Sequence, residues 1–141
     1  MQTFLPEMTF TASAQALDNK RLGKQRVEVL QLLRALSGES KGWVNHPACK
    51  MWRGHEAHLI AYGLEICNEW IDRGFRDTCK AKIWRFFEYF NLQNTKHPCF
   101  TWYKQEFITA HRSNLIRKNP EYYSHKWPDT PRDLPYIWPV K

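Results

Sequence analysis

The stretch that most constrains the fold runs from residue 17 to 36 and reads LDNKRLGKQRVEVLQLLRAL. Its apolar residues recur at intervals of three and four, which is the spacing of a buried helix face. These residues are Val27, Val29, Leu30, Leu32, Leu33 and Leu36. The pattern predicts one amphipathic helix. Thr11 or Ser13 could cap its start, and Gly38 is suited to end it.

A second strip of this predicted helix carries several cations and a single carboxylate. Its members are Lys20, Arg21, Lys24, Gln25 and Glu28, which overlie one another because residues three, four and seven apart share a face. A solvated face with ordinary ion pairs, each contributing about 0–1 kcal/mol, explains this spacing. A carboxylate held among cations that contact a polyanion is the alternative, which the spacing alone does not favour. Gly23, within the same helix, indicates a close approach by another backbone or by DNA.

Composition limits the class of protein. The 141 residues are enough for one domain with its own core, and 43% hydrophobic residues exclude a disordered chain. The net charge of +7 indicates a polyanionic partner. Aromatic residues make up 15% of the chain, and their faces can stack on unpaired bases. No apolar run reaches the ~20 residues of a membrane span and no signal peptide is evident, so we expect a cytoplasmic protein.

The remaining apolar segments predict further helices. Residues 49–73 form a second long helix in this interpretation, and residues 101–118 form another that ends before Pro120. Residues 81–90 are either a helix or a buried segment, and residues 91–98 form a turn.

The tail from Glu121 onward holds four prolines, three tyrosines and two tryptophans. Proline lacks a backbone N–H, so the tail can be neither a regular helix nor a central strand. So many aromatic side chains would be poorly tolerated in free solution, so we expect an ordered strap over the helical body. The predicted fold is all-α: a compact single domain, 1–141, with a bundle of three to four helices and this Pro- and aromatic-rich C-terminal strap.

One group of residues has the composition of a metal site. His46, Cys49, His55 and His58 are spaced H-x2-C-x5-H-x2-H, and four such ligands can close a tetrahedral zinc site. However, five residues between Cys49 and His55 are few for a finger loop, and Pro47 stiffens the entry. We therefore expect no metal, and we expect the four cysteines to be reduced, mostly buried thiols. A hydrolase using this cluster stays open as a minor alternative.

Four short segments together carry a resemblance to a known family. They are Leu17-Asp18 with Lys20, Leu22 and Glu28; Asn45-His46-Pro47; IDRGFRDT at 71–78; and LIRKNPEYY at 115–123. The first resembles the opening helix, and the others resemble later segments, of the pyrimidine-dimer DNA glycosylases, the family of the small endonuclease V of T-even phages. The resemblance implies a DNA-repair enzyme that acts on double-stranded DNA, as a monomer, without metal or other cofactor.

The resemblance also implies a mechanism. In that family the α-amino group of the chain attacks the sugar C1′ and forms a Schiff base as the base leaves, and β-elimination then nicks the strand. The resemblance gives Glu28 the role of the catalytic carboxylate. The chain departs from the phage enzyme at Gln2, whose bulk would keep the initiator Met in place. The nucleophile is then Met1 itself or another group such as Lys24, or the protein is a glycosylase without lyase activity.

The candidate DNA contacts come from two basic segments and one loop. We expect phosphate contacts from Lys20, Arg21, Lys24, Arg26, Arg112, Arg117 and Lys118. Trp43 and His46 lie on the predicted loop at 37–47, where a base or the gap it leaves could be probed. Alternatively, Trp43 packs against the protein and His46 caps the following helix.

Two functions from different classes remain. The first is a glycosylase that removes pyrimidine dimers or related damaged bases, with or without AP-lyase activity. The second is a non-catalytic helical module that binds DNA or RNA. Glu28 discriminates between them, because a binder would gain affinity on losing this negative charge whereas a glycosylase would lose turnover.

Overall fold

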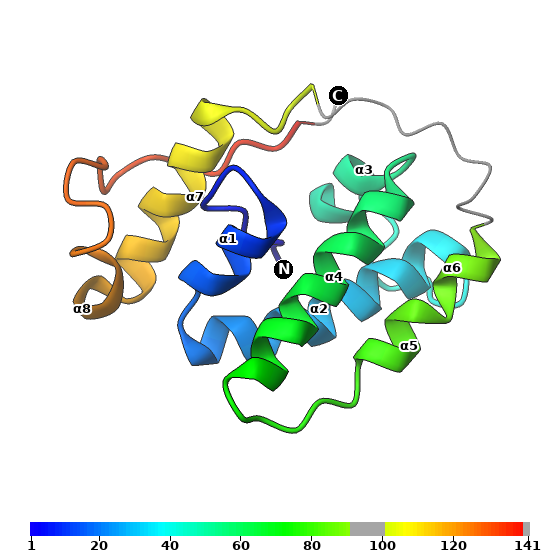
Figure 1. The fold of residues 1–141 in the computed structure, drawn as a ribbon. Coiled ribbons are helices and arrows are strands. Elements are labelled where there is room, and N and C mark those ends of the chain that lie inside the picture. The colour runs from blue at the N-terminus through cyan, green and yellow to red at the C-terminus, as the bar shows by residue number, and fades with distance from the viewer. Residues whose placement is uncertain (91–100, 140–141) are drawn as a thin grey trace.

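The computed structural model describes residues 1–90 and 101–139. Three long helices, α2 (Asn19–Ser37), α4 (Glu56–Asp72) and α7 (Gln105–Lys118), form the body of the molecule (Figure 1). Short helices complete it: α1 (Phe10–Ala16), α3 (Pro47–Trp52), α5 (Lys80–Trp84), α6 (Phe86–Tyr89) and α8 (Pro120–Tyr123). The described residues contain no strand, so the predicted all-α fold is confirmed. More helices form than the three to four expected, because several predicted long helices are broken.

The first break separates α1 from α2. Thr9 caps α1 through its side chain, and the predicted caps Thr11 and Ser13 lie inside that helix, so the cap prediction was wrong. The chain then runs extended through Asp18 before α2 begins. A contact distant in sequence stabilises this break, because the Asp18 backbone N–H donates to the Tyr123 hydroxyl at 2.8 Å.

Glycine in the left-handed region explains the next helix ends. Gly38 has φ of 87° and ends α2, as predicted. Gly54 also has φ of 87° and divides the predicted helix 49–73 into α3 and α4, because a side chain is strained in that conformation. The prediction of one continuous helix there was wrong.

Helix α2 packs along α4 through a buried face that contains most of the predicted residues, namely Val29, Leu30, Leu32 and Leu33, with Leu36 partly buried beside them. Val27 is 46% exposed, whereas Leu22, Val29 and Leu33 are fully buried. The close approach expected at Gly23 exists, and a side chain rather than a backbone makes it. A Cβ at Gly23 would lie 2.9 Å from the Trp70 ring, so the glycine allows the indole of α4 to pack against α2.

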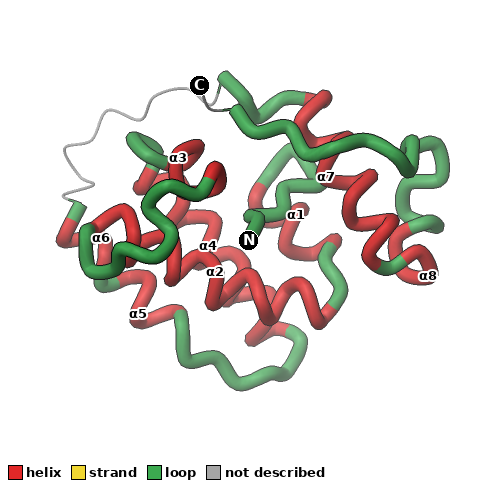
Figure 2. The backbone as a smooth tube through the Cα atoms, turned by 180° about the vertical axis from the view of Figure 1, so that it is seen from behind, coloured by secondary structure: helices red, strands yellow, loops and turns green. Residues whose placement is uncertain are grey.

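The segment that follows α7 is bound to that helix by hydrogen bonds. One helical turn, α8, interrupts the tail that was expected to contain no helix, and residues 124–139 then run as an irregular strap. The Arg117 guanidinium donates to the carbonyl oxygens of Arg132 and Leu134, both at 2.7 Å. The ordered strap is thus confirmed for the described residues, and it returns alongside α7 (Figure 2).

Other boundaries shifted as well. The predicted helix 101–118 begins only at Gln105, and segment 81–90 divides into the short helices α5 and α6. The predicted turn at 91–98 lies outside the described residues. Among the helices that the structure describes, none is long and apolar enough to cross a membrane.

Candidate active site

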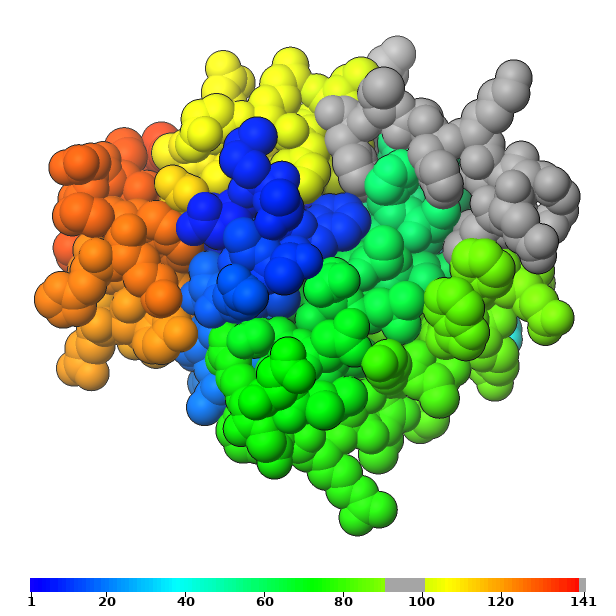
Figure 3. Space-filling view, in the orientation of Figure 1, coloured from blue at the N-terminus to red at the C-terminus, as the bar shows by residue number. Residues whose placement is uncertain are grey.

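The N-terminal segment is buried in the molecule rather than projecting from it. Gln2, Thr3, Phe4 and Leu5 are each 5% exposed or less. In Figure 3 the blue surface, which belongs to the N-terminal part of the chain including α1, lies between the yellow of α7 and the green of α4. Trp52 holds it by donating its indole N–H to the Thr3 hydroxyl at 2.8 Å.

His111 of α7 also holds the segment. Its Nδ1 accepts from the Leu5 backbone N–H at 2.9 Å. Burial lowers the pKa of His111 to about 3, because the charged imidazolium would lose its hydration. His111 is therefore neutral and joins the N-terminal segment to the C-terminal half.

Gln25 of α2 makes several hydrogen bonds to the N-terminal segment. Its Nε2 donates to the Gln2 carbonyl at 2.8 Å and to Glu28 Oε2 at 2.9 Å, and its Oε1 accepts from the Phe4 N–H at 3.1 Å. Because one of these backbone groups can only accept and the other can only donate, the orientation of the amide is fixed. The buried Tyr62 hydroxyl lies 2.8 Å from Oε1. Gln25 therefore joins Glu28 to the backbone of the first residues.

Glu28 itself is only 7% exposed. Besides the Gln25 amide, its Oε2 accepts from the Gln2 backbone N–H at 3.5 Å, and its Oε1 lies 3.8 Å from Lys24 Nζ. Helix spacing placed Lys24 one turn from Glu28, as predicted. No pattern in the sequence predicted the contact with Gln2, which brings the carboxylate to the start of the chain.

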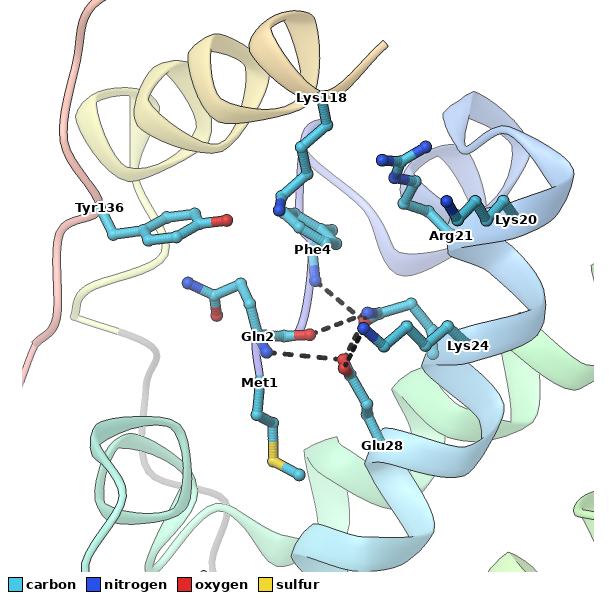
Figure 4. A pocket seen from close by; sticks show the side chains of 10 residues that line it. Met1, Gln2, Phe4, Lys20, Arg21, Lys24, Glu28, Lys118 and Tyr136 are labelled. Atoms are coloured by element: carbon cyan, nitrogen blue, oxygen red, sulfur yellow. Dashed lines mark hydrogen bonds and ion pairs between the residues drawn. The ribbon is translucent and has the colours of Figure 1, made fainter.

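Glu28 and Met1 line one cavity of about 300 Å³ (Figure 4). Four cations line it: Lys20, Arg21 and Lys24 from α2, and Lys118 from the end of α7. Arg21 also pairs with Asp18 at 3.2 Å. The aromatic rings of Phe4 and of Tyr136, which belongs to the strap, complete the lining. Tyr136 was not among the residues predicted for the site, because only the path of the strap brings it there.

The other three arginines predicted to contact DNA have partners within the protein. Arg26 pairs with Asp77 at 2.7 Å and lies over the Trp70 ring. Arg112 pairs with Glu7 at 2.8 Å and also donates to a backbone carbonyl. Arg117 holds the strap. None of these three lines the cavity.

On the loop before α3, the capping alternative for His46 is confirmed. His46 Nδ1 accepts from the Ala48 N–H at 3.0 Å, so the imidazole caps α3. Burial lowers the pKa of His46, and the positive charge of the N-terminal ammonium adds to the effect. The His46 ring contacts two indole rings edge to face. Its centroid lies 5.3 Å from that of Trp43 and 5.7 Å from that of Trp138. Trp43 is 37% exposed and so does not pack into the core.

The four residues spaced like zinc ligands do not form a metal site. In the part of the chain that the structure describes, no group of three or more His, Cys, Asp or Glu side chains could hold a metal ion. Cys49, Cys67 and Cys79 are buried free thiols, and burial raises the pKa of Cys49. Cys99 lies outside the described residues.

An N-terminus, a buried carboxylate and several cations that line one cavity are the groups expected of an enzyme that cleaves a glycosidic bond in a polyanion. Residues 1–83 match the family model described as "Pyrimidine dimer DNA glycosylase". The match covers more than half of the 141 residues, and the chain belongs to this family of DNA glycosylases, whose substrate is DNA. No curated protein and no solved structure matches the chain.

Proposed function

We propose that the protein is a bifunctional glycosylase and AP lyase, acting on pyrimidine dimers or closely related lesions, with the α-amine of Met1 as nucleophile and Glu28 as the catalytic carboxylate. The observation that carries the proposal is the attachment of Glu28 to the first residues of the chain. The Gln2 N–H faces its Oε2 at 3.5 Å, and Gln25 ties the same oxygen to the Gln2 carbonyl. The preceding residue, Met1, lines the same cavity.

In the first step the lone pair of the amine forms a bond to C1′ of the damaged nucleotide. The C1′–N1 bond breaks, and its electron pair leaves with the pyrimidine, which later takes up a proton. The positive charge that builds on the sugar lies near the Glu28 carboxylate, and preorganised opposite charge of this kind is an effective source of rate acceleration.

In the second step the attached nitrogen loses its proton, and the C1′–O4′ bond opens as O4′ takes up a proton, which leaves a Schiff base between Met1 and C1′. Removal of a C2′ proton then expels the 3′-phosphate by β-elimination and nicks the strand. Glu28, held by Gln25, is the carboxylate we assign to the proton transfers in both steps.

The cations around the cavity suit the phosphates that flank the damaged nucleotide. Lys20, Lys24 and Lys118 are exposed residues that line it, and their ammonium groups carry three donors each. We assign Lys118 to a phosphate on the side opposite α2, since it comes from the end of α7.

The test uses duplexes that carry either a cyclobutane dimer or a preformed abasic site, incubated with borohydride. Reduction fixes a Schiff base, so a bifunctional enzyme gives a covalent protein–DNA adduct that survives denaturation. Base release without an adduct would make water the nucleophile and the enzyme monofunctional. Neither release nor adduct across a panel of damaged bases would favour the non-catalytic binding module.

A further inference from the structure

The Gln2 side chain has a hydrogen-bonding group that the fold does not use. Gln2 Oε1 accepts from the Thr3 backbone N–H at 2.9 Å, and because that group can only donate, the orientation of the carboxamide is fixed. Its Nε2 has no hydrogen-bond partner in the described residues, although Gln2 is only 4% exposed. A buried donor without an acceptor is destabilising and uncommon, so it requires an explanation.

The position of this carboxamide points to a ligand. Gln2 lines the cavity that Met1 and Glu28 share. Its backbone N–H faces Glu28, whereas its side chain extends away from Glu28 and toward Tyr136 (Figure 4). The cavity therefore has a carboxylate on one wall and an unused N–H donor on the other, with Lys118 also lining it.

The two walls match the two charges that glycosidic cleavage creates. As the C1′–N1 bond breaks, the sugar becomes positive, and the electron pair that stays on N1 spreads onto the carbonyl oxygen O2 of the pyrimidine. A carboxylate stabilises the first charge and an N–H donor stabilises the second. Because Gln2 directly follows Met1, its side chain is within one residue of the amine that would be bonded to C1′.

We propose that Gln2 is a catalytic residue for base departure, whose Nε2 donates a hydrogen bond to the O2 carbonyl of the leaving pyrimidine. The inference rests on the proposed function, since it needs C1′ to be attacked in this cavity. If the proposal holds, Gln2 affects the reaction rate only while a base is attached to the sugar. An abasic site has no base to stabilise, and so it provides an internal control.

The experiment compares Gln2→Glu and Gln2→Met with the wild-type protein on the two duplexes. Gln2→Glu keeps an acceptor for the Thr3 N–H while losing the amide donor, and Gln2→Met removes both polar atoms at similar size. Both side chains are bulky, so Met1 should be retained, which intact mass spectrometry checks. Glycosidic cleavage at the dimer is read as alkali-labile strand breakage, and reaction at the abasic site as the rate of borohydride trapping.

We expect both variants to cleave the dimer at least about tenfold more slowly, as for loss of a donor to a developing negative charge. Trapping at the abasic site should change by less than about twofold. Gln25→Met is the matched control, because its side chain holds both Glu28 and the N-terminal backbone. That variant should slow the two reactions together.

Equal slowing of both reactions in the Gln2 variants would show that the side chain is structural and would overturn the proposal, as would unchanged cleavage of the dimer. Failure of the proposed nucleophile is distinguishable from either result. If the wild-type protein cleaves the glycosidic bond but forms no adduct, the amine is excluded, and the cleavage rates of the variants still test Gln2.

Discussion

The cations at the cavity and the cations beneath the strap differ in what they contact. At the cavity, Lys24 lies 3.8 Å from Glu28 but its side chain is 72% exposed, and Lys118 is exposed at the end of α7. Beneath the strap, Arg112 and Arg117 bind a carboxylate and backbone carbonyls of the protein itself. The planar fork of arginine suits such multiple internal bonds, whereas a lysine ammonium remains available to solvent and to DNA.

This difference shows that basic residues near one another in sequence can have separate tasks. Arg117 and Lys118 are adjacent, but one holds the strap and the other lines the cavity. On α2, Arg26 pairs with Asp77 while Lys24 faces the cavity. We therefore expect DNA binding to depend on the lysines that line the cavity, and folding to depend on Arg26, Arg112 and Arg117.

Loss of the carboxylate at the cavity should reduce activity more than any other change considered. Glu28→Gln keeps the size of the side chain but removes the charge opposite the developing positive sugar, so base release should fall by about 10²–10³ or more. DNA affinity should stay the same or increase, because a negative charge is removed from a phosphate-facing surface. Glu39→Gln, at an exposed carboxylate paired with Arg85, is the control and should leave activity unchanged. Full activity in Glu28→Gln would remove this carboxylate from the mechanism.

The next effect is a loss of stability when an arginine that binds within the protein is replaced. Arg26→Gln leaves Asp77, whose side chain is 3% exposed, without its ion-pair partner. We expect the free energy of unfolding in urea to fall by about 3 kcal/mol. The salt dependence of DNA binding should not change. Arg76→Gln removes an exposed charge from the same loop and serves as the control. A variant that keeps its stability but binds DNA with a weaker salt dependence would reverse this assignment.

A pH effect should arise where the N-terminal segment meets α7. The pKa of His111 is about 3 in the folded protein, whereas an unfolded histidine titrates near 6.5. Between these values the unfolded chain binds a proton that the native protein does not, so stability falls as pH decreases, by at most about 1.4 kcal/mol per pH unit from this residue.

His111→Gln keeps an acceptor for the Leu5 N–H but cannot titrate. Urea unfolding between pH 6.5 and 5 should show a smaller loss of stability per pH unit in this variant than in the wild-type protein, although the variant is less stable overall. Parallel pH profiles for the two proteins would mean that His111 is not the titrating group.

The smallest effect is on the salt dependence of DNA binding, and it should distinguish Lys118 from its neighbour Arg117. Lys118→Gln should reduce the slope of log affinity against log salt by about 0.9, which corresponds to one phosphate contact. Arg117→Gln should leave that slope unchanged while lowering the melting temperature, because the Arg132 carbonyl loses its donor and the Leu134 carbonyl keeps only the longer hydrogen bond from Asn114. Equal changes of slope in both variants would remove the distinction between the two positions.

Local pattern was enough to predict some of these features. Periodicity in 17–36 predicted α2, and helix spacing placed Lys20, Arg21, Lys24 and Glu28 on one strip, four residues that the structure brings to the cavity. The left-handed Gly38 at the end of α2 followed from residue type alone. Each of these depends on residues within a few turns of one another.

Contacts between distant segments could not be predicted in this way. Gln25 was placed among the polar residues of a helix face, but it is buried because Gln2, Phe4 and Tyr62 supply its partners. For the same reason, the sequence could not distinguish arginines that bind other parts of the protein from arginines that are available to DNA. The partner of Arg26 is Asp77, and no local pattern predicts a pair so far apart in sequence.

If the amine of Met1 is the nucleophile beside Glu28, peptide mass spectrometry of the borohydride-trapped adduct will locate the DNA on that amine. We predict that the sugar is attached to the α-nitrogen of Met1, and that acetylating this amine or adding residues before it prevents trapping while salt-dependent DNA binding persists. An adduct on Lys24 or Lys20, with undiminished trapping by the acetylated protein, would contradict the claim and move the nucleophile onto α2.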